Sequence, residues 1–436
     1  MTGRHGTVRP GMWQLPIALT VLSALAWGPA TRAGVVAIRG GDLYTITDGV
    51  MRGGTLLIED GKITKVGTAV LVPEGAQVID ATGKVVMPGL IAARMDGAIG
   101  GSGSTVAGGV DPYNASISFA LASGITAGYV QTGTARPASD GIRNAVIKMA
   151  EGDLESIVVR EPADVNVAYE VSSPSAKAQL RRSLTEAADF LRLKTQFDRD
   201  TAAGKKPEEP KEPRGAGPAL QLLRGELPAR ISASSATDIL CALELARDFG
   251  IHLILEDTIE GWIVAQDIAR YDADVIMTPR AMQEGDDRLN APSGSSKEQA
   301  AILRRAGIHL AIVPSGTGFS TGGDFGNDLF TLPLEAAWAV GGGLDEESAL
   351  ASITIEPARM LGVADRMGSL EVGKDGDVIV LNGHPLHYST LVDVTLVDGK
   401  VLYERSKSPY FSHMGAAEEP AADTTDGDAP SPDGGA

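Results

Sequence analysis

Helix-like and strand-like segments alternate through the middle of this chain, and this alternation limits the fold more than any other feature. Strands are expected at Val85–Pro88, Thr126–Val130, Asn144–Lys148, Ala229–Ser232, His252–Glu256, Asp274–Thr278 and His309–Val313. Helices are expected at Pro112–Ala122, Ser175–Phe197, Ala236–Asp248, Gly261–Arg270, Glu298–Ala306 and Leu332–Val340. This rhythm predicts parallel βα units, and over 436 residues it favours a distorted (β/α)8 TIM barrel of the α/β class. A doubly wound open sheet is the alternative, but no G-x-G-x-x-G motif follows a predicted strand.

Both ends of the chain are rich in short strands. They are expected at Val35–Ile38, Leu43–Ile46, Thr55–Glu59 and Lys62–Val66, and again at Asp377–Leu381, Leu391–Val397 and Lys400–Tyr403. Asp60-Gly61 and Asp398-Gly399 are hairpin turn signals. We therefore expect one composite β-sandwich that both chain ends build together, with the barrel between them.

The first residues are typical of an export signal. Arg4 and Arg9 precede an apolar run, Leu15–Trp27, and Ala33 is a suitable cleavage position. The apolar run is short for a membrane span, so no stable span is expected after cleavage. The protein is expected to be exported to the periplasm or the extracellular space. The expected segments are a signal peptide (1–33), two halves of the sandwich (34–84 and 366–410), the barrel (85–365) and a disordered acidic tail (411–436).

Composition excludes some classes of partner. The formal net charge is −18 and aromatic residues make up 5% of the chain, so nucleic-acid binding is not expected. Cys241 is the one cysteine. It lies in an amphipathic helical run, which indicates a buried structural thiol and no intramolecular disulfide.

Three segments resemble the amidohydrolase superfamily, in particular its imidazolonepropionase-like and prolidase-like branch. "VIDATGKVVMPGLI" resembles the entry into barrel strand 1, and "ELPARISASSATDILCALELARDFGIHLILEDTIEG" resembles the region of strands 5 and 6. "ALASITIEPARMLGVADRMGSLEVGKDGDVIVLNGHPL" resembles the return into the sandwich. The resemblance spans roughly residues 35–405. It implies hydrolysis of non-peptide C–N bonds or of dipeptides by one or two divalent ions, typically zinc, held at the carboxyl ends of barrel strands.

The resemblance also implies where the metal ligands would lie. The His-x-His pair after strand 1 falls on Arg94 and Asp96, and the metal-bridging lysine falls on Lys148. The strand 5 and strand 6 histidines fall on Ser232, Ser234 and Asp257, and the strand 8 aspartate falls near Pro314 or Ser315. The histidines and the final aspartate of the family are thus replaced. Zinc prefers nitrogen and sulfur ligands, and no histidine or cysteine at these positions supplies them. No metal cofactor is therefore expected.

The other histidines do not replace the lost ligands. His252 and His309 each begin a predicted strand, which places them at the barrel floor and away from the mouth. We expect Arg94 to pair with Asp96 or Asp257, and Lys148 to pair with the other carboxylate, so that two ion pairs take the place of the metal.

Three functions remain open at this stage. The first is a catalytically degenerate, exported amidohydrolase that acts as a binding or assembly partner, in a homo-oligomer or with an intact relative. The second is an active enzyme with metal-free or unusual-ligand chemistry on amides, cyclic amides or short peptides. In that case Lys148 and Asp257 are the candidate catalytic residues, with Ser232 or Ser234 as the nucleophile and Lys148 as the base. The third is a small-molecule carrier.

Overall fold

The computed structural model describes the chain from residue 34 to residue 414, apart from short internal gaps. The described residues are 34–97, 105–132, 143–150, 152, 154–167, 173–286, 288, 291–319 and 328–414. The predicted signal peptide and the end of the predicted acidic tail lie outside these residues.

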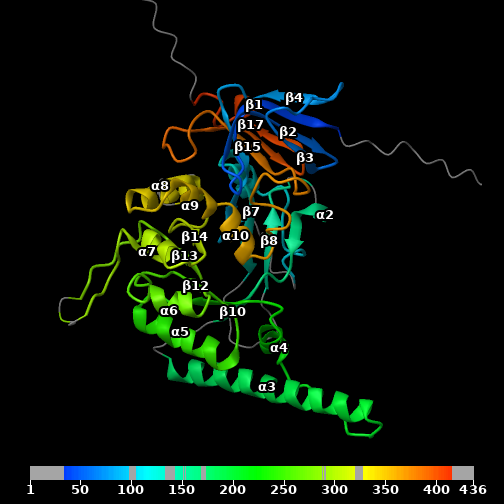
Figure 1. Cartoon of the computed structure of the whole chain (residues 1–436), viewed down its shortest axis with the longest axis vertical. Coiled ribbons are helices and arrows are strands. Elements are labelled where there is room, and N and C mark those ends of the chain that lie inside the picture. Colours follow the sequence, from blue (N-terminus) through cyan, green and yellow to red (C-terminus); the bar gives the residue numbers. More distant parts are fainter. Residues whose placement is uncertain are drawn as a thin grey trace, which may run out of the picture. The chain divides into compact units, whose positions relative to one another are not determined.

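Strands from both chain ends form one hydrogen-bonded sheet of eight strands, ordered β17-β16-β15-β5-β1-β2-β3, with β4 beside β1. The N-terminal strands are β1 (Val36–Tyr44), β2 (Val50–Glu59), β3 (Lys62–Gly67), β4 (Gln77–Asp80) and β5 (Val85–Pro88). The C-terminal strands are β15 (Val378–Leu381), β16 (Val392–Val397) and β17 (Lys400–Glu404). The first strand (blue) and the last (red) therefore lie in the same sheet (Figure 1).

Local sequence explains the turns of this sheet. Asp60 and Gly61 have φ of 51° and 79°, and Asp398 and Gly399 have φ of 49° and 71°. These positive values fit the tight hairpins predicted for both dipeptides. The two strands expected at Val35–Ile38 and Leu43–Ile46 are instead one strand, β1, whose pairing with β2 shifts register on both sides of Gly41.

The middle of the chain contains two further sheets. β10 (Val165–Val167), β11 (Ala229–Ser232), β12 (Leu253–Glu256), β13 (Asp274–Met277) and β14 (Leu310–Ile312) form a parallel sheet in chain order. β6 (Leu90–Ala92), β7 (Ile125–Thr132), β8 (Arg143–Lys148) and β9 (Val158–Arg160) form the other. β6 and β7 are parallel, but β8 and β9 alternate in direction, contrary to a regular barrel.

Hydrogen bonds connect these two sheets at both sides. Ile91 in β6 donates its amide to the carbonyl of Ile353 (2.9 Å), and Ile312 in β14 donates its amide to the carbonyl of Ser352 (3.0 Å). The segment Ser352-Ile353 therefore lies between β6 and β14. On the other side, the side chain of Asn144 in β8 bonds the backbone just before β10. The middle of the chain is thus a mixed α/β region without a continuous strand ladder among the described residues.

Helices alternate with the strands, as predicted. They are α1 (Ala115–Ala122), α2 (Leu154–Ile157), α3 (Pro174–Ala202), α4 (Gly217–Leu223), α5 (Ala236–Phe249), α6 (Ala265–Arg270), α7 (Gln299–Arg305), α8 (Leu332–Gly341), α9 (Glu346–Ala351) and α10 (Ile355–Met360). Short 3-10 turns lie at Leu329–Thr331 and Arg405–Lys407. Cys241 in α5 is half-buried rather than buried.

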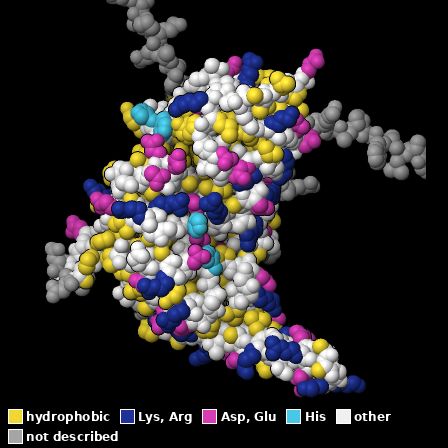
Figure 2. Space-filling model, viewed as in Figure 1, with side chains coloured by type: hydrophobic (Ala, Val, Ile, Leu, Met, Phe, Trp, Pro, Cys, Tyr) yellow, Lys and Arg dark blue, Asp and Glu magenta, His cyan; other side chains and the backbone are white. Residues whose placement is uncertain are grey.

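Among the described residues, none of the helices combines the length and apolar character that a membrane span requires. On the face shown in Figure 2, Lys and Arg side chains are interspersed with Asp and Glu side chains. That face therefore carries no extended basic patch, in keeping with the net charge of −18.

Candidate functional site

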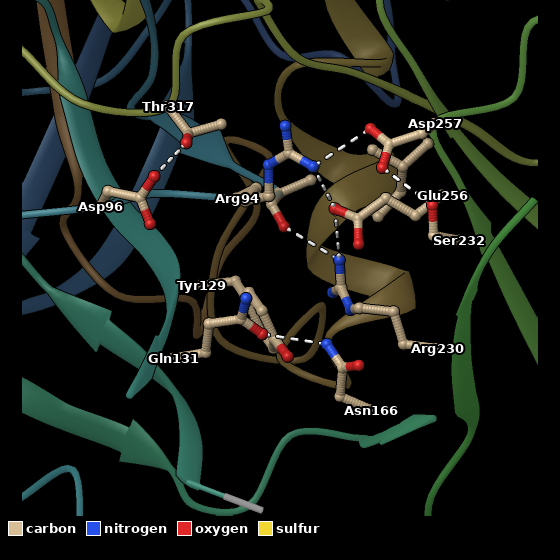
Figure 3. Close-up of polar contacts among 12 residues, drawn as sticks. Arg94, Asp96, Tyr129, Gln131, Asn166, Arg230, Ser232, Glu256, Asp257 and Thr317 are labelled. Carbon is tan, nitrogen blue, oxygen red and sulfur yellow. Dashed lines mark hydrogen bonds and ion pairs between the residues drawn. The ribbon is translucent and has the colours of Figure 1, made fainter. Parts of the chain in front are cut away.

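Arg94 lies two residues beyond β6 and is the centre of the site (Figure 3). Its Nη1 donates to Oε1 of Glu256 at 3.2 Å and to Oδ1 of Asp257 at 3.1 Å. The side chain is 23% exposed, so solvent reaches it from one side. The predicted pairing of Arg94 with Asp257 is confirmed, and Glu256 is a second partner that the sequence analysis did not identify.

Two neighbouring parallel strands supply the acceptors. Ser232 ends β11 and lies opposite Glu256, which ends β12. Asp257 follows with φ of 56°, a left-handed conformation that is uncommon for residues other than glycine. Its Oδ2 accepts a hydrogen bond from Ser232 Oγ at 3.1 Å. The Asp257 carboxylate is therefore held between Ser232 on one oxygen and Arg94 on the other.

A second arginine lies in the layer beneath. Arg230 precedes Ser232 by two residues, so both side chains belong to the same face of β11. Arg230 is 1% exposed and donates from Nε to Asp164 Oδ2 at 2.6 Å. Its Nη1 lies 3.5 Å from Oε1 of Glu256, the same oxygen that accepts from Arg94. Glu256 thus connects the two guanidinium groups.

Asp164 is the lower end of this network and is fully bonded. Its Oδ1 accepts from the hydroxyl of Tyr129 at 3.0 Å and from the amide of Asn144 at 2.9 Å. The Tyr129 ring also stacks on the guanidinium of Arg230, 3.8 Å from the ring centroid. Charges alternate along the chain Arg94, Glu256, Arg230 and Asp164, which is how buried ions avoid being unpaired.

The electrostatics follow from these contacts. Burial alone would lower the pKa of Arg94, but Glu256, Asp257 and then Asp96 together raise it. Burial likewise disfavours charged Arg230, yet Asp164, Tyr129 and Glu256 raise its pKa. Burial, with Asp164 nearby, holds the pKa of Tyr129 well above its ordinary value. Both arginines are therefore permanent cations, and Tyr129 is a neutral hydrogen-bond donor.

The remaining predicted positions are arranged differently from the expectation. Asp96 does not bond Arg94; it accepts a short hydrogen bond from Thr317, and its amide donates to the Thr317 carbonyl at 2.6 Å. Ser234 accepts backbone hydrogen bonds at its carbonyl from the segment after Asp257. Ser315 is exposed in the loop after β14. Thr317, two residues further on, is the residue of that loop that meets Asp96.

The prediction that Lys148 lies with Arg94 and Asp257 is wrong. Because β8 runs antiparallel to β7, its last residue, Lys148, pairs with Ala127 near the start of β7. There its Nζ contacts Asp375, Asp377 and Asp398 of the eight-stranded sheet. Lys148 therefore cannot bridge metals or act as a base beside Ser232, and the nucleophile–base pair proposed from the sequence is not formed.

The two strand-initial histidines lie as predicted, before β12 and β14. His252 Nε2 is 2.9 Å from Asp274, which begins β13. His309 Nδ1 is 2.7 Å from Glu356 of α10. His252 is thus exposed and His309 half-buried, each beside a carboxylate at the amino end of its strand, away from Arg94 and Ser232.

The described donor set does not fit a catalytic metal. Among residues 34–414, apart from the gaps, no group of three or more His, Cys, Asp or Glu side chains is arranged to hold a metal ion. The two carboxylates at the end of β12 are already bonded to Arg94, and zinc prefers nitrogen and sulfur ligands. A hard cation such as Mg²⁺ or Ca²⁺ prefers carboxylate oxygens, but at this place it would be repelled by the positive charge of Arg94.

Comparison with known proteins decides the family. An amidohydrolase family model matches residues 265–403. A crystal structure of an amidohydrolase from Thermotoga maritima MSB8 superimposes with a TM-score of 0.69 at 25% identity, covering 85% of this chain and 100% of that one. The chain belongs to the amidohydrolase superfamily. Its curated sequence matches include imidazolonepropionases, in agreement with the imidazolonepropionase-like branch of that superfamily.

The curated amidohydrolase relatives match only part of this chain. A probable imidazolonepropionase from Xenopus laevis is 29% identical over 177 residues, which is 38% of this chain and 36% of that protein. An imidazolonepropionase from Clostridium tetani is 33% identical over 102 residues, 22% of this chain and 23% of the relative. The matched segments thus span only 36% and 23% of the lengths of these two relatives. A putative prolidase from Bifidobacterium longum, at 18% identity and a TM-score of 0.51, shares the fold.

Arg230 and Glu256 are marked in the sequence by their places in predicted strands. Arg230 lies two positions before Ser232 in β11, so strand alternation directs both to one face. Glu256 is the charged last residue of β12, whose other residues, Leu253, Ile254 and Leu255, are apolar. Asp164 and Thr317 have no comparable pattern, because each lies outside a strand.

Proposed function

We propose that this chain is a catalytically degenerate, metal-free amidohydrolase that acts by binding, as a partner in an assembly or as a receptor for a small ligand. The observation that carries the proposal is the position of Arg94. Its guanidinium contacts both carboxylates at the end of β12, at 3.1 and 3.2 Å. A permanent cation in this place repels a divalent ion and supplies positive charge of its own.

The rest of the proposal concerns architecture and location. The two middle sheets would be arcs of a distorted (β/α)8 barrel, and the eight-stranded sheet would be the composite sandwich. The N-terminal residues 1–33 would direct export to the periplasm or the extracellular space. The partner would be a second copy of the chain or an intact amidohydrolase.

The test restores the missing ligands. We expect the purified protein to bind no stoichiometric zinc in isothermal titration at pH 7.5. A matched variant carrying Arg94→His, Asp96→His, Ser232→His and Asp257→His regains nitrogen donors at the predicted ligand positions, and we expect it to bind zinc. Stoichiometric zinc in the unaltered protein, with turnover of dipeptides or lactams, would overturn the proposal.

One observation favours a second candidate, a metal-free hydrolase. Ser232 donates its hydroxyl to Asp257, so a carboxylate already orients a hydroxyl at the strand ends. A screen of dipeptides, cyclic amides and simple amides would detect this activity. Turnover that Asp257→Asn and Ser232→Ala both abolish, at unchanged stability, would favour this candidate over the first.

A further inference from the structure

A buried cluster of charges lies where β8 meets the eight-stranded sheet. Lys148 is fully buried, and its Nζ contacts three carboxylates: Asp375 at 2.6 Å, Asp377 at 3.0 Å and Asp398 by a short hydrogen bond. The cluster therefore joins a strand of the middle region to the segment before β15 and to the β16–β17 turn. We call Lys148, Asp375, Asp377 and Asp398 the joint cluster.

The three carboxylates of the joint cluster have unequal partners. Asp375 also contacts Lys62 and lies 2.9 Å from Arg366, so three cations surround it. Asp377 has Lys148 as its cation partner among the described contacts, and its Oδ2 accepts no hydrogen bond there. Asp377 is 4% exposed, and the charges of both other acids of the cluster act on it. It is thus the carboxylate with the least compensation.

Asp377 also accepts hydrogen bonds from the backbone amides of two segments that meet at the joint cluster. Its carbonyl accepts the amide of Gly89 at 3.0 Å, the residue between β5 and β6. Its Oδ1 accepts the amide of Asp398 at 2.9 Å. A change of charge at Asp377 is therefore felt by the connection into β6 and by the β16–β17 turn.

We propose that the joint cluster is a proton-controlled connection: protonation of Asp377 tightens the attachment of β6–β8 to the eight-stranded sheet, and its ionisation loosens that attachment. With Asp377 neutral, Lys148 is shared by two carboxylates instead of three. The amide of Asp398 keeps its acceptor, because a protonated carboxyl still has acceptor capacity.

The direction of the pKa shift agrees with this geometry. Burial is the main cause that raises the pKa of Asp377 from 3.8 to about 6, with help from Asp398 and Asp375 and against Lys148. Burial also opposes ionised Asp375, but Lys148, Lys62 and Arg366 lower its pKa. The same three acids raise the pKa of Lys148, although burial alone would lower it. Asp377 is thus the group of the cluster that titrates near neutral pH.

The sign of the effect follows from linkage. A group whose pKa is raised by folding binds its proton more tightly in the folded state, so its contribution is complete below 3.8 and is lost as the pH rises through about 6. Glu335, whose pKa burial raises, changes stability in the same direction. The pKa of His252 is raised by Asp274, and its contribution is lost above 6.5. A comparison with a variant of Asp377 separates these effects.

The test is the thermal unfolding midpoint of the full chain between pH 5 and pH 7.5. Asp377→Asn fixes the neutral form in both the folded and the unfolded state, so we expect its midpoint to exceed that of the unaltered protein at pH 7.5 by on the order of 3 °C and to exceed it by less at pH 5. Asp393→Asn is the control, because Asp393 lies in β16, outside the cluster, with a pKa that Lys84 and Arg405 lower against burial. It should leave the pH dependence unchanged.

Hydrogen exchange tests the joint cluster directly, because it reports the opening of individual backbone segments rather than the stability of the whole chain. Hydrogen exchange of peptides that contain Gly89 and Asp398 should be faster at pH 7.5 than at pH 5, after correction for intrinsic rates, and this difference should vanish in Asp377→Asn. An unchanged pH dependence in Asp377→Asn overturns the proposal. So does a variant that is less stable than the unaltered protein at both pH values, since the ionised carboxylate would then be the stabilising form.

Discussion

At the scale of single residues, Arg94 and Arg230 have the same side chain but different consequences for the site. Arg230 is almost completely buried and bonds Asp164 and Glu256, so it is part of the interior. Arg94 is 23% exposed and bonds Glu256 and Asp257, so it faces solvent. Glu256 connects them through one oxygen. Removing Arg94 therefore leaves a carboxylate that still has one cation, whereas removing Arg230 would leave Asp164 with none.

The first prediction concerns Arg94→Met, which keeps the length of the side chain and removes its charge. We expect a loss of about 1–3 kcal/mol in the free energy of unfolding, because Glu256 and Asp257 lose a hydrogen-bonded cation at 3.1–3.2 Å. Urea unfolding at pH 7.5 measures it. The control is Arg52→Met: Arg52 is 79% exposed and pairs with Asp42 on the surface, so its loss should stay below about 1 kcal/mol. Equal losses in both variants would contradict an internal role for Arg94.

Residue identities predicted part of this site. The pairing of Arg94 with Asp257 follows from the resemblance, which puts both residues at strand ends facing one site. The strand predicted before Arg94, Val85–Pro88, is however β5 of the eight-stranded sheet, and Arg94 follows β6, which the sequence did not predict as a separate strand. The prediction for Lys148 is wrong because it assumes a parallel βα unit, whereas β8 pairs antiparallel with both of its neighbours along the chain, β7 and β9. Asp164 was missed since its partners, Tyr129 and Arg230, are remote in sequence.

At the scale of elements, the connection between β5 and β6 is a single residue, Gly89. β5 belongs to the eight-stranded sheet and β6 to a middle sheet, so this residue carries the chain from one to the other. A Cβ at Gly89 would lie 2.0 Å from Oγ1 and 2.2 Å from Cγ2 of Thr126 in β7. The close approach of the two strands, rather than a special backbone angle, requires glycine here. The sequence marks the turn with Pro88-Gly89 but does not identify Thr126.

The second prediction is that Gly89→Ala costs about 1–3 kcal/mol or more in unfolding free energy, because the added methyl overpacks a buried contact. Gly217→Ala is the control, since nothing lies within 4 Å of a Cβ there, and we expect a change within about 0.5 kcal/mol. Adding Thr126→Gly to Gly89→Ala removes the atoms that clash. If this second substitution restores no stability, the contact with Thr126 is not the cause.

At the scale of the whole molecule, the two chain ends and the middle depend on each other. The ends form one sheet, and β5 pairs with β1 from its own end and with β15 from the other. The sequence predicted that both ends build one composite β-sandwich, because short strands and a hairpin turn signal occur at each end of a long middle region, and the two ends do share one sheet. It did not predict the joint cluster, since Lys148 meets Asp375 and Asp398 across more than 200 residues.

The last prediction tests that dependence with Lys148→Met. At pH 7.5 the variant leaves Asp377 buried without its cation, so we expect a loss of about 3–5 kcal/mol in the free energy of unfolding. The loss should be smaller at pH 5, where Asp377 is protonated, because the pKa of Asp377 is about 6.

Lys84→Met is the control: Lys84 is 37% exposed, and its partner Asp393 keeps Arg405, so its loss should be under about 1 kcal/mol at either pH. Urea unfolding followed by circular dichroism measures both losses, because guanidinium chloride is a salt and would screen the exposed pair of the control. A loss for Lys148→Met that is the same at both pH values would mean that Asp377 is not the carboxylate this lysine compensates.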